Sequence, residues 1–453
     1  MTNKYLIPLL LLPLSVISPA QAEVELIAIG KVSASYQDMS FRTAAPLESG
    51  IAGNLLGGVG SGLAYAGGNT FLALPDRGPN ADPYNTNVDD TTSYINRFHT
   101  FSLALASNPH FNPATVGSLP YVLSPFLLDT TLLSRKTPLV YAQGGAPALN
   151  TKGRFYYTGR SDNFDASKLS TNRNNARLDP EAIRVSADGK SVFITDEYGP
   201  YVYQFSRTTG KLIKAFNLPA HFAVSKLSSV GDAVEIPGNT SGRTANKGME
   251  GLAITPDGKY LVGIMQANLI QDTKKYLRIV KINIASGAVA EYAYLLTDGS
   301  GVSEILAIND HEFLVDERDG KGLGDNSTAV VKKLYKIDLA GATDVLGVTN
   351  LTATTPVVAK TLFLDVVTKL TANGIPGSEV PAKIEAIAFG PDIVKGGVTK
   401  HTLFVANDND FLVSVNGIAN PNQFFVFSID SADLPNFVPQ KILPLPQDNR
   451  DHG

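Results

Sequence analysis

The chain has 453 residues, and its 38 Lys and Arg against 42 Asp and Glu leave a formal net charge of −4 at pH 7. This near balance, without any basic run, argues against binding along a nucleic-acid backbone. No cysteine is present, which excludes disulfides and a cysteine-linked lipid anchor. The 40 Gly, 27 Pro, 17 Tyr and 21 Phe supply turn formers and strand-favouring aromatic residues, so the composition predicts a β protein.

The first residues of the chain have the pattern of an export signal. Lys4 precedes an apolar run from Tyr5 to Ile17, and Ala20-Gln21-Ala22 offers the small-residue pattern that a signal peptidase cleaves before Glu23. A membrane anchor is the weaker alternative, because the run contains two prolines and is shorter than the roughly 20 residues of a membrane span. We therefore expect a signal peptide over residues 1–22 and a periplasmic or secreted protein without a membrane anchor after cleavage.

Four segments of the chain repeat one plan. Each has a glutamate, a short alternating apolar strand, a turn, a second apolar strand, and then acidic or amide residues. The copies begin at Asp179, Met249, Ser303 and Ile384. A fifth, degenerate copy begins at Ser61, which stands where the others have glutamate. Period-2 alternation broken by Asp-Gly at 188–189 and 257–258 predicts β-hairpins.

Each hairpin is followed by a second pair of predicted strands, and four strands per repeated unit predict the blades of a β-propeller. The interval from Ser61 to Glu181 is about double the others, so either one blade is unrecognisable there or an insertion lies near residues 145–178. We predict one all-β propeller domain over residues 23–446, with six four-stranded blades favoured over five or seven, and a polar tail over 447–453. Residues 23–29 are the candidate strand that closes the ring with the last blade.

The repeated acidic residues form the candidate functional site. Because the first strand of each propeller blade lines the central channel, glutamates far apart in sequence should converge near one mouth. Like charges raise one another's pKa, and a hard cation would relieve that repulsion. Clustered Asp, Glu and Asn oxygens suit Ca²⁺ best and Mg²⁺ next, whereas Zn²⁺ is disfavoured in a chain without Cys and with only six His. The predicted metal ligands are Glu181, Asp196, Glu250, Glu304, Asp316, Glu317, Glu385, Asp408 and Asp410.

Structural roles are the alternative for each of these acids. They could cap turns, accept bonds from backbone N–H groups, or pair with Arg184, Arg278 and Arg318. Other catalytic patterns are missing from the sequence: it has no Gly-x-Ser-x-Gly elbow, Walker A loop, His-Glu-x-x-His motif or Rossmann fingerprint. Covalent serine catalysis is therefore unsupported.

Six short motifs carry a resemblance to a known family. They are Asp76-Arg77-Gly78-Pro79-Asn80, Asp179-Pro180-Glu181-Ala182-Ile183, Asp196-Glu197-Tyr198-Gly199-Pro200, Lys247-Gly248-Met249-Glu250-Gly251-Leu252, Asp316-Glu317-Arg318-Asp319 and Asn407-Asp408-Asn409-Asp410-Phe411. Together they resemble the family described by the esterase-like activity of phytase, over about residues 45 to 430. The resemblance implies a propeller, a secreted or periplasmic setting, and calcium-dependent hydrolysis of esters or phosphoesters. The chain departs from the family pattern at Ala182, where Gly or Asp is common.

The leading hypothesis is a Ca²⁺-dependent esterase or phosphoesterase that acts on a small molecule as a monomer. The metal would polarise the phosphoryl or acyl oxygen and activate water, with Asp76 and Glu197 beside the reacting groups. Arg77 and Arg318 could bind phosphate oxygens, with Lys247 as a further cation. For both arginines, a plain salt bridge to a neighbouring carboxylate is an equal alternative.

Two rival hypotheses remain open. A lactonase-type propeller would use the same metal on an uncharged cyclic ester, and the cations near the mouth argue mildly against it. A non-enzymatic, calcium-stabilised propeller would bind a sugar or a protein partner. In that case, removing the metal would lower stability without removing any activity.

Overall fold

The computed structural model describes residues 23–80 and 92–445 of the chain. The predicted signal peptide over 1–22 and the polar tail over 447–453 lie outside the described residues. Within the described ranges, no helix is long and apolar enough to cross a membrane.

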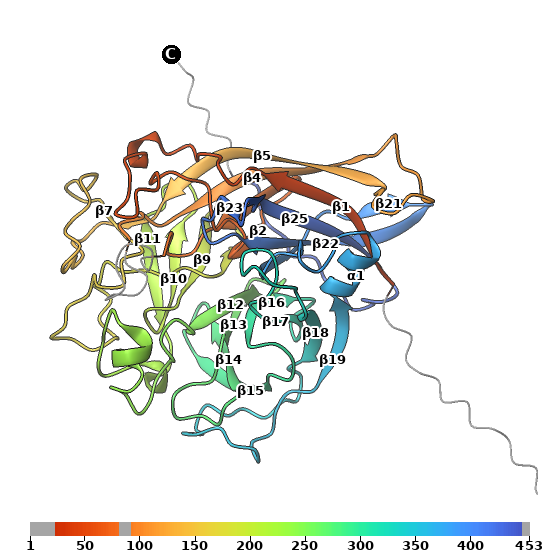
Figure 1. Ribbon diagram of the computed structural model, residues 1–453. Helices are drawn as coiled ribbons and strands as arrows, with labels where there is room; N and C mark the ends of the chain where they lie inside the picture. The colour runs from red at the N-terminus through yellow and green to blue at the C-terminus, as the bar shows by residue number, and fades with distance from the viewer. Residues whose placement is uncertain (1–22, 81–91, 446–453) are drawn as a thin grey trace, which may run out of the picture.

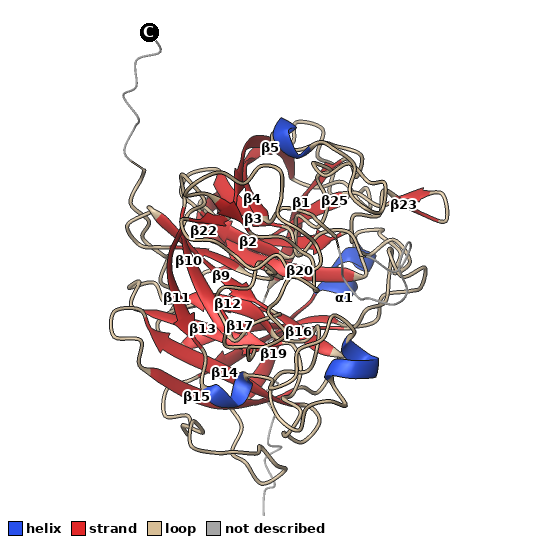
Figure 2. Ribbon diagram, turned by 90° about the vertical axis from the view of Figure 1, so that its left-hand side faces the viewer, coloured by secondary structure: helices blue, strands red, loops and turns tan. Residues whose placement is uncertain are grey.

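Five antiparallel sheets, four of four strands and one of five, make up the body of the molecule, and loops and a few short helices lie around them (Figures 1 and 2). Blade 1 contains β2 (Gly62–Tyr65), β3 (Thr70–Leu74), β4 (Arg97–Ser107) and β5 (Tyr121–Leu132). Blade 2 contains β8 (Ile183–Val185), β9 (Ser191–Asp196), β10 (Tyr201–Ser206) and β11 (Leu212–Asn217). Blade 3 contains β12 (Met249–Ile254), β13 (Tyr260–Met265), β14 (Tyr276–Asn283) and β15 (Val289–Leu295). Blade 4 contains β16 (Gly301–Ala307), β17 (Glu312–Arg318), β18 (Lys332–Asp338) and β19 (Lys360–Asp365).

Blade 5 joins the two ends of the domain. Its strands are β20 (Lys383–Phe389), β22 (Val398–Asp408), β25 (Asn422–Asp430) and β1 (Val24–Val32), and the short β21 (Ile393–Lys395) pairs with β22. Two further hairpins are β6 (Ser134–Arg135) with β7 (Phe155–Tyr156) and β23 (Ser414–Val415) with β24 (Ile418–Ala419). The helical segments are α1 (Val366–Ala372), two 3₁₀ turns (Phe41–Thr43 and Ala220–Phe222) and one π turn (Gly231–Glu235).

The first strands of the five blades contact one another in a closed ring, in the order β2, β8, β12, β16 and β20. This confirms the predicted propeller, but the favoured number of six blades is wrong: the described residues form five. Between β5 and β8 the chain forms only the small β6–β7 hairpin and turns. The long interval after Ser61 is therefore an insertion, the alternative that the sequence left open.

The N-terminal strand closes the ring, as the sequence predicts. β1 pairs antiparallel with β25, and Leu26 lies opposite Phe427 (red beside blue in Figure 1). Both side chains are buried in one core cluster between the last two blades. Because burying a large apolar side chain contributes roughly 1.5–3 kcal/mol, this pairing stabilises the ring.

Both faces of a blade are buried, because each blade is sandwiched between two neighbours. In β9, Val192 and Ile194 pack into the core shared with blade 1, whereas Phe193 packs into the core shared with blade 3. Alternate residues of a strand point to opposite faces, so the side chains of a run such as Val-Phe-Ile pack into both neighbouring cores. The five blades are therefore held rigidly enough to position side chains at the channel mouths.

The channel is blocked between its two mouths. The Arg184 guanidinium donates to the carbonyls of Leu63 (2.6 Å) and Ile305 (3.1 Å) and lies 2.8 Å from a carboxylate oxygen of Glu304. Arg184 thus ties together the inner strands of blades 1, 2 and 4 across the axis. A ligand entering at one mouth cannot pass through to the other.

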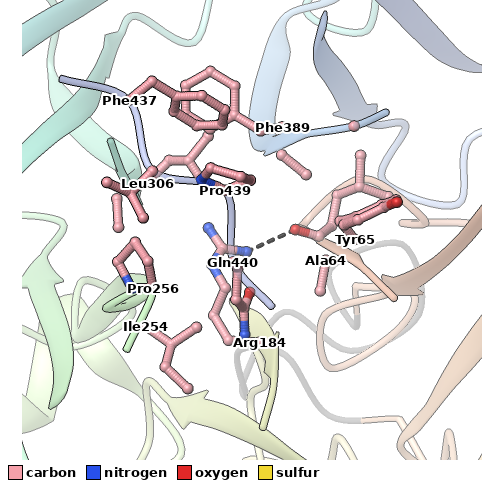
Figure 3. A pocket seen from close by; sticks show the side chains of 15 residues that line it. Ala64, Tyr65, Arg184, Ile254, Pro256, Leu306, Phe389, Phe437, Pro439 and Gln440 are labelled. Carbon is pink, nitrogen blue, oxygen red and sulfur yellow. Dashed lines mark hydrogen bonds between the residues drawn. The ribbon is translucent and has the colours of Figure 1, made fainter. Parts of the chain in front are cut away.

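The C-terminal segment covers one mouth, where the hairpin turns of the blades lie. Val438 N donates to Ile308 O (2.9 Å), and Gln440 Nε2 donates to Val185 O (2.7 Å). Figure 3 shows Phe437, Pro439 and Gln440 among side chains from the last residues of the inner strands. The small cavity left there is mostly apolar and has no carboxylate in its lining, so it does not fit acid–base chemistry.

Candidate active site

The opposite mouth holds a strongly charged cavity of about 240 Å³, which we call the acidic cavity. The inner strands begin at this mouth, and the second strands of the blades end there. Its carboxylates are Asp76, Glu181, Glu197, Glu250, Glu385 and Asp408. Its cations are Arg77, Lys247, Arg318 and Lys383. The structure therefore brings six of the predicted acids and all three predicted cations into one cavity.

β-Bulges at the start of the inner strands select which side chains enter the cavity. The strand register shifts at Glu250 in β12, at Glu385 in β20 and at Ser303 in β16. A bulge inserts one unpaired residue and re-aims its side chain. Since a shift of one residue moves a side chain to the other face, Ser303 of blade 4, and not Glu304, corresponds to Glu250. Ser303 accordingly lines the acidic cavity.

Three buried carboxylates lie together at the acidic cavity, and two of them, Glu181 and Glu197, line it. Asp179, Glu181 and Glu197 each offer an oxygen within 4.8 Å of the others. Glu197 accepts a bond from Gly248 N (2.8 Å), which fixes its position. Burial and the charges of Asp179, Glu250 and Glu197 raise the pKa of Glu181 well above its ordinary value. We call these three residues the carboxylate triad.

Glu250 extends the triad toward the centre of the cavity. It is 3 % exposed, and its Oε1 accepts a bond from Gln266 (2.8 Å). Its Oε2 is buried without a hydrogen-bond partner among the described residues. Burial, and then Glu197 and Glu385, raise the pKa of Glu250 well above its ordinary value. An unpartnered carboxylate oxygen beside three others, all hard donors, fits a hard divalent cation.

The remaining carboxylates of the cavity are paired with cations. Arg318 contacts Glu385 and donates from Nε to Ser303 Oγ (2.6 Å). Lys383 Nζ lies 3.1 Å from Asp408 and 2.5 Å from Asp410; the predicted ligand Asp410 is not among the residues that line the cavity. Each of these carboxylates therefore has a cation beside it, and Arg318 Nη2 also lies 3.9 Å from Glu250 Oε1.

Arg77 links these cations to the triad. Its Nη1 lies 3.1 Å from Asp179 Oδ2 and 3.0 Å from Asn246 Oδ1. Asp76 accepts a bond from Gly78 N (2.9 Å), while burial and Asp408 raise the pKa of Asp76. The salt bridges that the sequence offered as an alternative role for Arg77 and Arg318 are both present. They also hold the two guanidinium groups at the cavity.

Four other predicted ligands lie elsewhere, where they have structural roles or no partner. Asp196 Oδ1 accepts bonds from the backbone N–H groups of Asp179 (3.2 Å) and Tyr198 (3.0 Å), so it shapes the turns that carry the triad. Glu317 accepts bonds from Tyr294 and Asp298 N and contacts Lys360, away from the cavity. Glu304 accepts a bond from Leu252 N and faces Arg184. Asp316 is fully buried with neither oxygen hydrogen-bonded among the described residues.

The sequence predicts no role for Asp179, Lys383 or Gln266. Asp179 stands two residues before Glu181, and Lys383 stands two residues before Glu385. In an extended chain, residues two apart point to the same side. That spacing is the signal that could have identified Asp179 and Lys383, whereas nothing in the local sequence singles out Gln266.

Asp316→Asn is expected to make the protein more stable than the wild type at pH 8 and to lose this advantage near pH 4. Burial raises the pKa of Asp316 to about 8. Between about pH 4 and 8 the unfolded chain gives up this proton and the folded chain keeps it, so the wild-type free energy of unfolding falls as pH rises. The wild-type free energy of unfolding should fall by at most roughly 1.4 kcal/mol per pH unit from this one group. Urea unfolding of both proteins with chelator measures it, and a difference that does not vary with pH would contradict the assignment.

Several known proteins are similar to this chain. An "Uncharacterized secreted protein" of Arthroderma benhamiae is 30 % identical over 279 residues, which is 53 % of this chain and 51 % of that protein. The chain therefore spans about half the length of this curated relative.

Solved structures give weaker matches. Regucalcin from Agrobacterium tumefaciens, described as a calcium-binding protein, shares 9 % identity at a TM-score of 0.33, over 92 % of this chain and 99 % of that one. A putative 6-phosphogluconolactonase from Bacteroides uniformis shares 12 % identity at a TM-score of 0.31, over 81 % and 88 % of the two chains. Similarities this low carry no argument about function.

The family comparison covers most of the chain. Residues 54–411 match the model of the family "Phytase-like: Esterase-like activity of phytase". All six motifs that carry the resemblance lie within this range. The chain belongs to the phytase-like family, described by the esterase-like activity of phytase.

Proposed function

We propose that this protein is an exported, Ca²⁺-dependent hydrolase of small phosphoesters or carboxylic esters. One observation carries the proposal: a triad of buried carboxylates lies beside a set of cations at a single cavity of about 240 Å³. Such a cavity can hold a divalent cation at its carboxylates and the anionic part of a substrate at its cations. Membership of the phytase-like family supports the same chemistry. The export pattern at the N-terminus and the secreted relative support the location.

Asp179, Glu181, Glu197 and Glu250 would hold the metal, and their oxygen ligands suit Ca²⁺ better than Mg²⁺, which demands a stricter octahedron. A bound Ca²⁺ would polarise the phosphoryl or acyl oxygen and lower the pKa of an attacking water. Side chains of the protein would orient the substrate and transfer the proton. Arg318 and Arg77 orient the oxygens of the substrate with paired N–H donors.

Proton transfer requires a carboxylate with a raised pKa that does not bind the metal. Asp76 is the candidate, because burial and the charge of Asp408 raise its pKa well above the ordinary value, and a group with a raised pKa can pass a proton to a leaving oxygen or take one from water. Lys247 is exposed at the edge of the cavity, where its charge attracts an anionic substrate. The channel is blocked at Arg184, so substrate and product use the same mouth.

Hydrolysis of p-nitrophenyl phosphate and p-nitrophenyl butyrate tests the proposal, with Ca²⁺ and with chelator. We expect turnover of at least one substrate with Ca²⁺, and a loss of roughly 100-fold in Glu250→Gln, because this variant lacks the charge of one proposed metal ligand. Glu379→Gln is the matched control, since Glu379 is exposed and outside the cavity. If neither substrate turns over while Ca²⁺ still raises the melting temperature, the protein is a calcium-stabilised binding propeller.

A further inference from the structure

A second cavity, of about 460 Å³, adjoins the acidic cavity, and the two share Asn246 and Lys247 in their walls. Arg177, Arg243 and Ser229 also line this second cavity, which we call the arginine cleft. The proposed hydrolysis uses neither arginine. The cleft therefore needs an explanation of its own.

Arg177 is the unusual residue of the cleft. Its side chain is only 4 % exposed and lies against the rings of Phe164 (4.8 Å) and Tyr198 (5.3 Å). Its Nη1 donates one hydrogen bond, to Ser161 O (3.2 Å). In the part of the chain that the structure describes, no carboxylate lies within ion-pair distance of this guanidinium.

A buried charge without a partner is costly. Guanidinium carries five N–H donors, and among the described residues one of those of Arg177 donates a hydrogen bond. Desolvating an unpaired ion is unfavourable, and an anionic ligand in the cleft would offset that cost. The two rings hold the guanidinium plane in place while its remaining donors stay available to the cleft. This is the arrangement expected of a preorganised anion receptor.

Neighbouring charges compensate Arg177 only in part. Burial and the charge of Arg243 lower its pKa, while the more distant carboxylates of Glu235 and Asp196 oppose that shift. Arg243 is already paired with Glu235 (2.6 Å) and donates from Nε to Tyr198 O (3.1 Å). Asp232 lines the cleft but is exposed to solvent, which screens its charge. Lys247 is exposed at the boundary with the acidic cavity and adds a second positive charge.

We propose that the arginine cleft binds a phosphate or carboxylate group, with Arg177 as its main donor and Lys247 between the cleft and the acidic cavity. The binding of an anion here does not depend on the proposed hydrolysis. Its use as a substrate subsite does rest on that function. The substrate would then carry a second anionic group, which the arginine cleft would bind while the reacting ester lies in the adjoining acidic cavity.

Titration calorimetry with inorganic phosphate, on the mature chain with chelator present, tests the binding. Arg177→Gln is expected to weaken phosphate binding by at least about 10-fold, because it removes a buried charge-assisted donor. Ser229→Glu should weaken it similarly by placing a negative charge at the cleft without altering the core. Arg207→Gln is the matched control: Arg207 also donates to one backbone carbonyl, Gly189 O (3.3 Å), but lies near the turns of the opposite mouth.

Unchanged phosphate binding in folded Arg177→Gln overturns the proposal, and if that variant does not fold, unchanged binding in Ser229→Glu does so. Equal losses in Arg177→Gln and Arg207→Gln would also overturn it, since the effect would then be one of overall charge. A kinetic measurement tests the substrate subsite separately. In Arg177→Gln, the KM of a bisphosphate ester should rise about 10-fold, while the KM of p-nitrophenyl butyrate should not change.

Discussion

Glu181→Gln is expected to lower Ca²⁺-stimulated hydrolysis by at least about 100-fold and to weaken Ca²⁺ binding by a similar factor. Replacing a residue that only hydrogen-bonds to a metal ligand already lowers metal affinity or activity roughly 10–100-fold, and replacing a ligand itself should cost no less. Glu181 lies within 4.8 Å of its two triad partners, and the charges that raise its pKa are all carboxylates. Glutamine keeps the size of the side chain and removes its charge. Initial rates and calorimetric Ca²⁺ titration of the purified variant measure both effects.

The same substitution should stabilise the metal-free protein, because it removes one of several mutually repelling buried acids. Glu379→Gln, on the surface, should change neither the rate nor Ca²⁺ binding. A Glu181→Gln protein that binds Ca²⁺ as tightly as the wild type would show that the triad is not the metal site.

The second large effect is on the free energy of unfolding: we expect it to fall with rising pH in the metal-free protein, and we expect Ca²⁺ to reverse that trend. Burial raises the pKa of Glu197 to about 7, and those of Glu181 and Glu250 also rise above their ordinary value of 4.5. Below pH 4.5, the folded and unfolded chains both hold these protons. Between about pH 4.5 and 7, the unfolded chain loses them first, so the metal-free free energy of unfolding should fall as pH rises, by roughly 1.4 kcal/mol per unit and per proton.

Ca²⁺ binds the deprotonated groups, so its stabilising effect should grow over the same pH range. At 100 times its dissociation constant, a ligand adds about 2.7 kcal/mol. Urea unfolding at pH 5 and pH 8, with Ca²⁺ or with chelator, gives the four values needed. Equal Ca²⁺ stabilisation at both pH values would mean that the metal does not bind these raised carboxylates.

Much of the fold could be predicted from the sequence, because propeller blades repeat local signals. Alternating strands and Asp-Gly turns identify the hairpins, and the N-terminal strand was correctly assigned to the last blade. The blade number could not be predicted. An insertion after β5 lengthens one interval to about two repeats, and an irregular segment of that length looks the same in sequence as a degenerate blade.

The site was predicted only in part, and Glu304 shows the physical reason. Its sequence context matches that of Glu250, but the bulge in β16 lies at Ser303, so Glu304 points to Arg184 in the channel. A bulge shifts register without leaving a local sequence signal. Glu317 differs for another reason: its partner Lys360 comes from a strand 43 residues away, a distance over which the sequence predicts no pairing.

The most direct test of the account follows Ca²⁺ binding and hydrolysis in one titration. Chelator-treated mature protein would receive Ca²⁺ stepwise, with heat of binding and rate of p-nitrophenyl phosphate or butyrate hydrolysis recorded at each step. The account predicts that the rate rises from near zero and reaches half its maximum at the concentration that half-saturates the site, with both signals lost in Glu181→Gln. Hydrolysis at full rate with chelator, or Ca²⁺ binding that leaves the rate at zero for every ester, would contradict it.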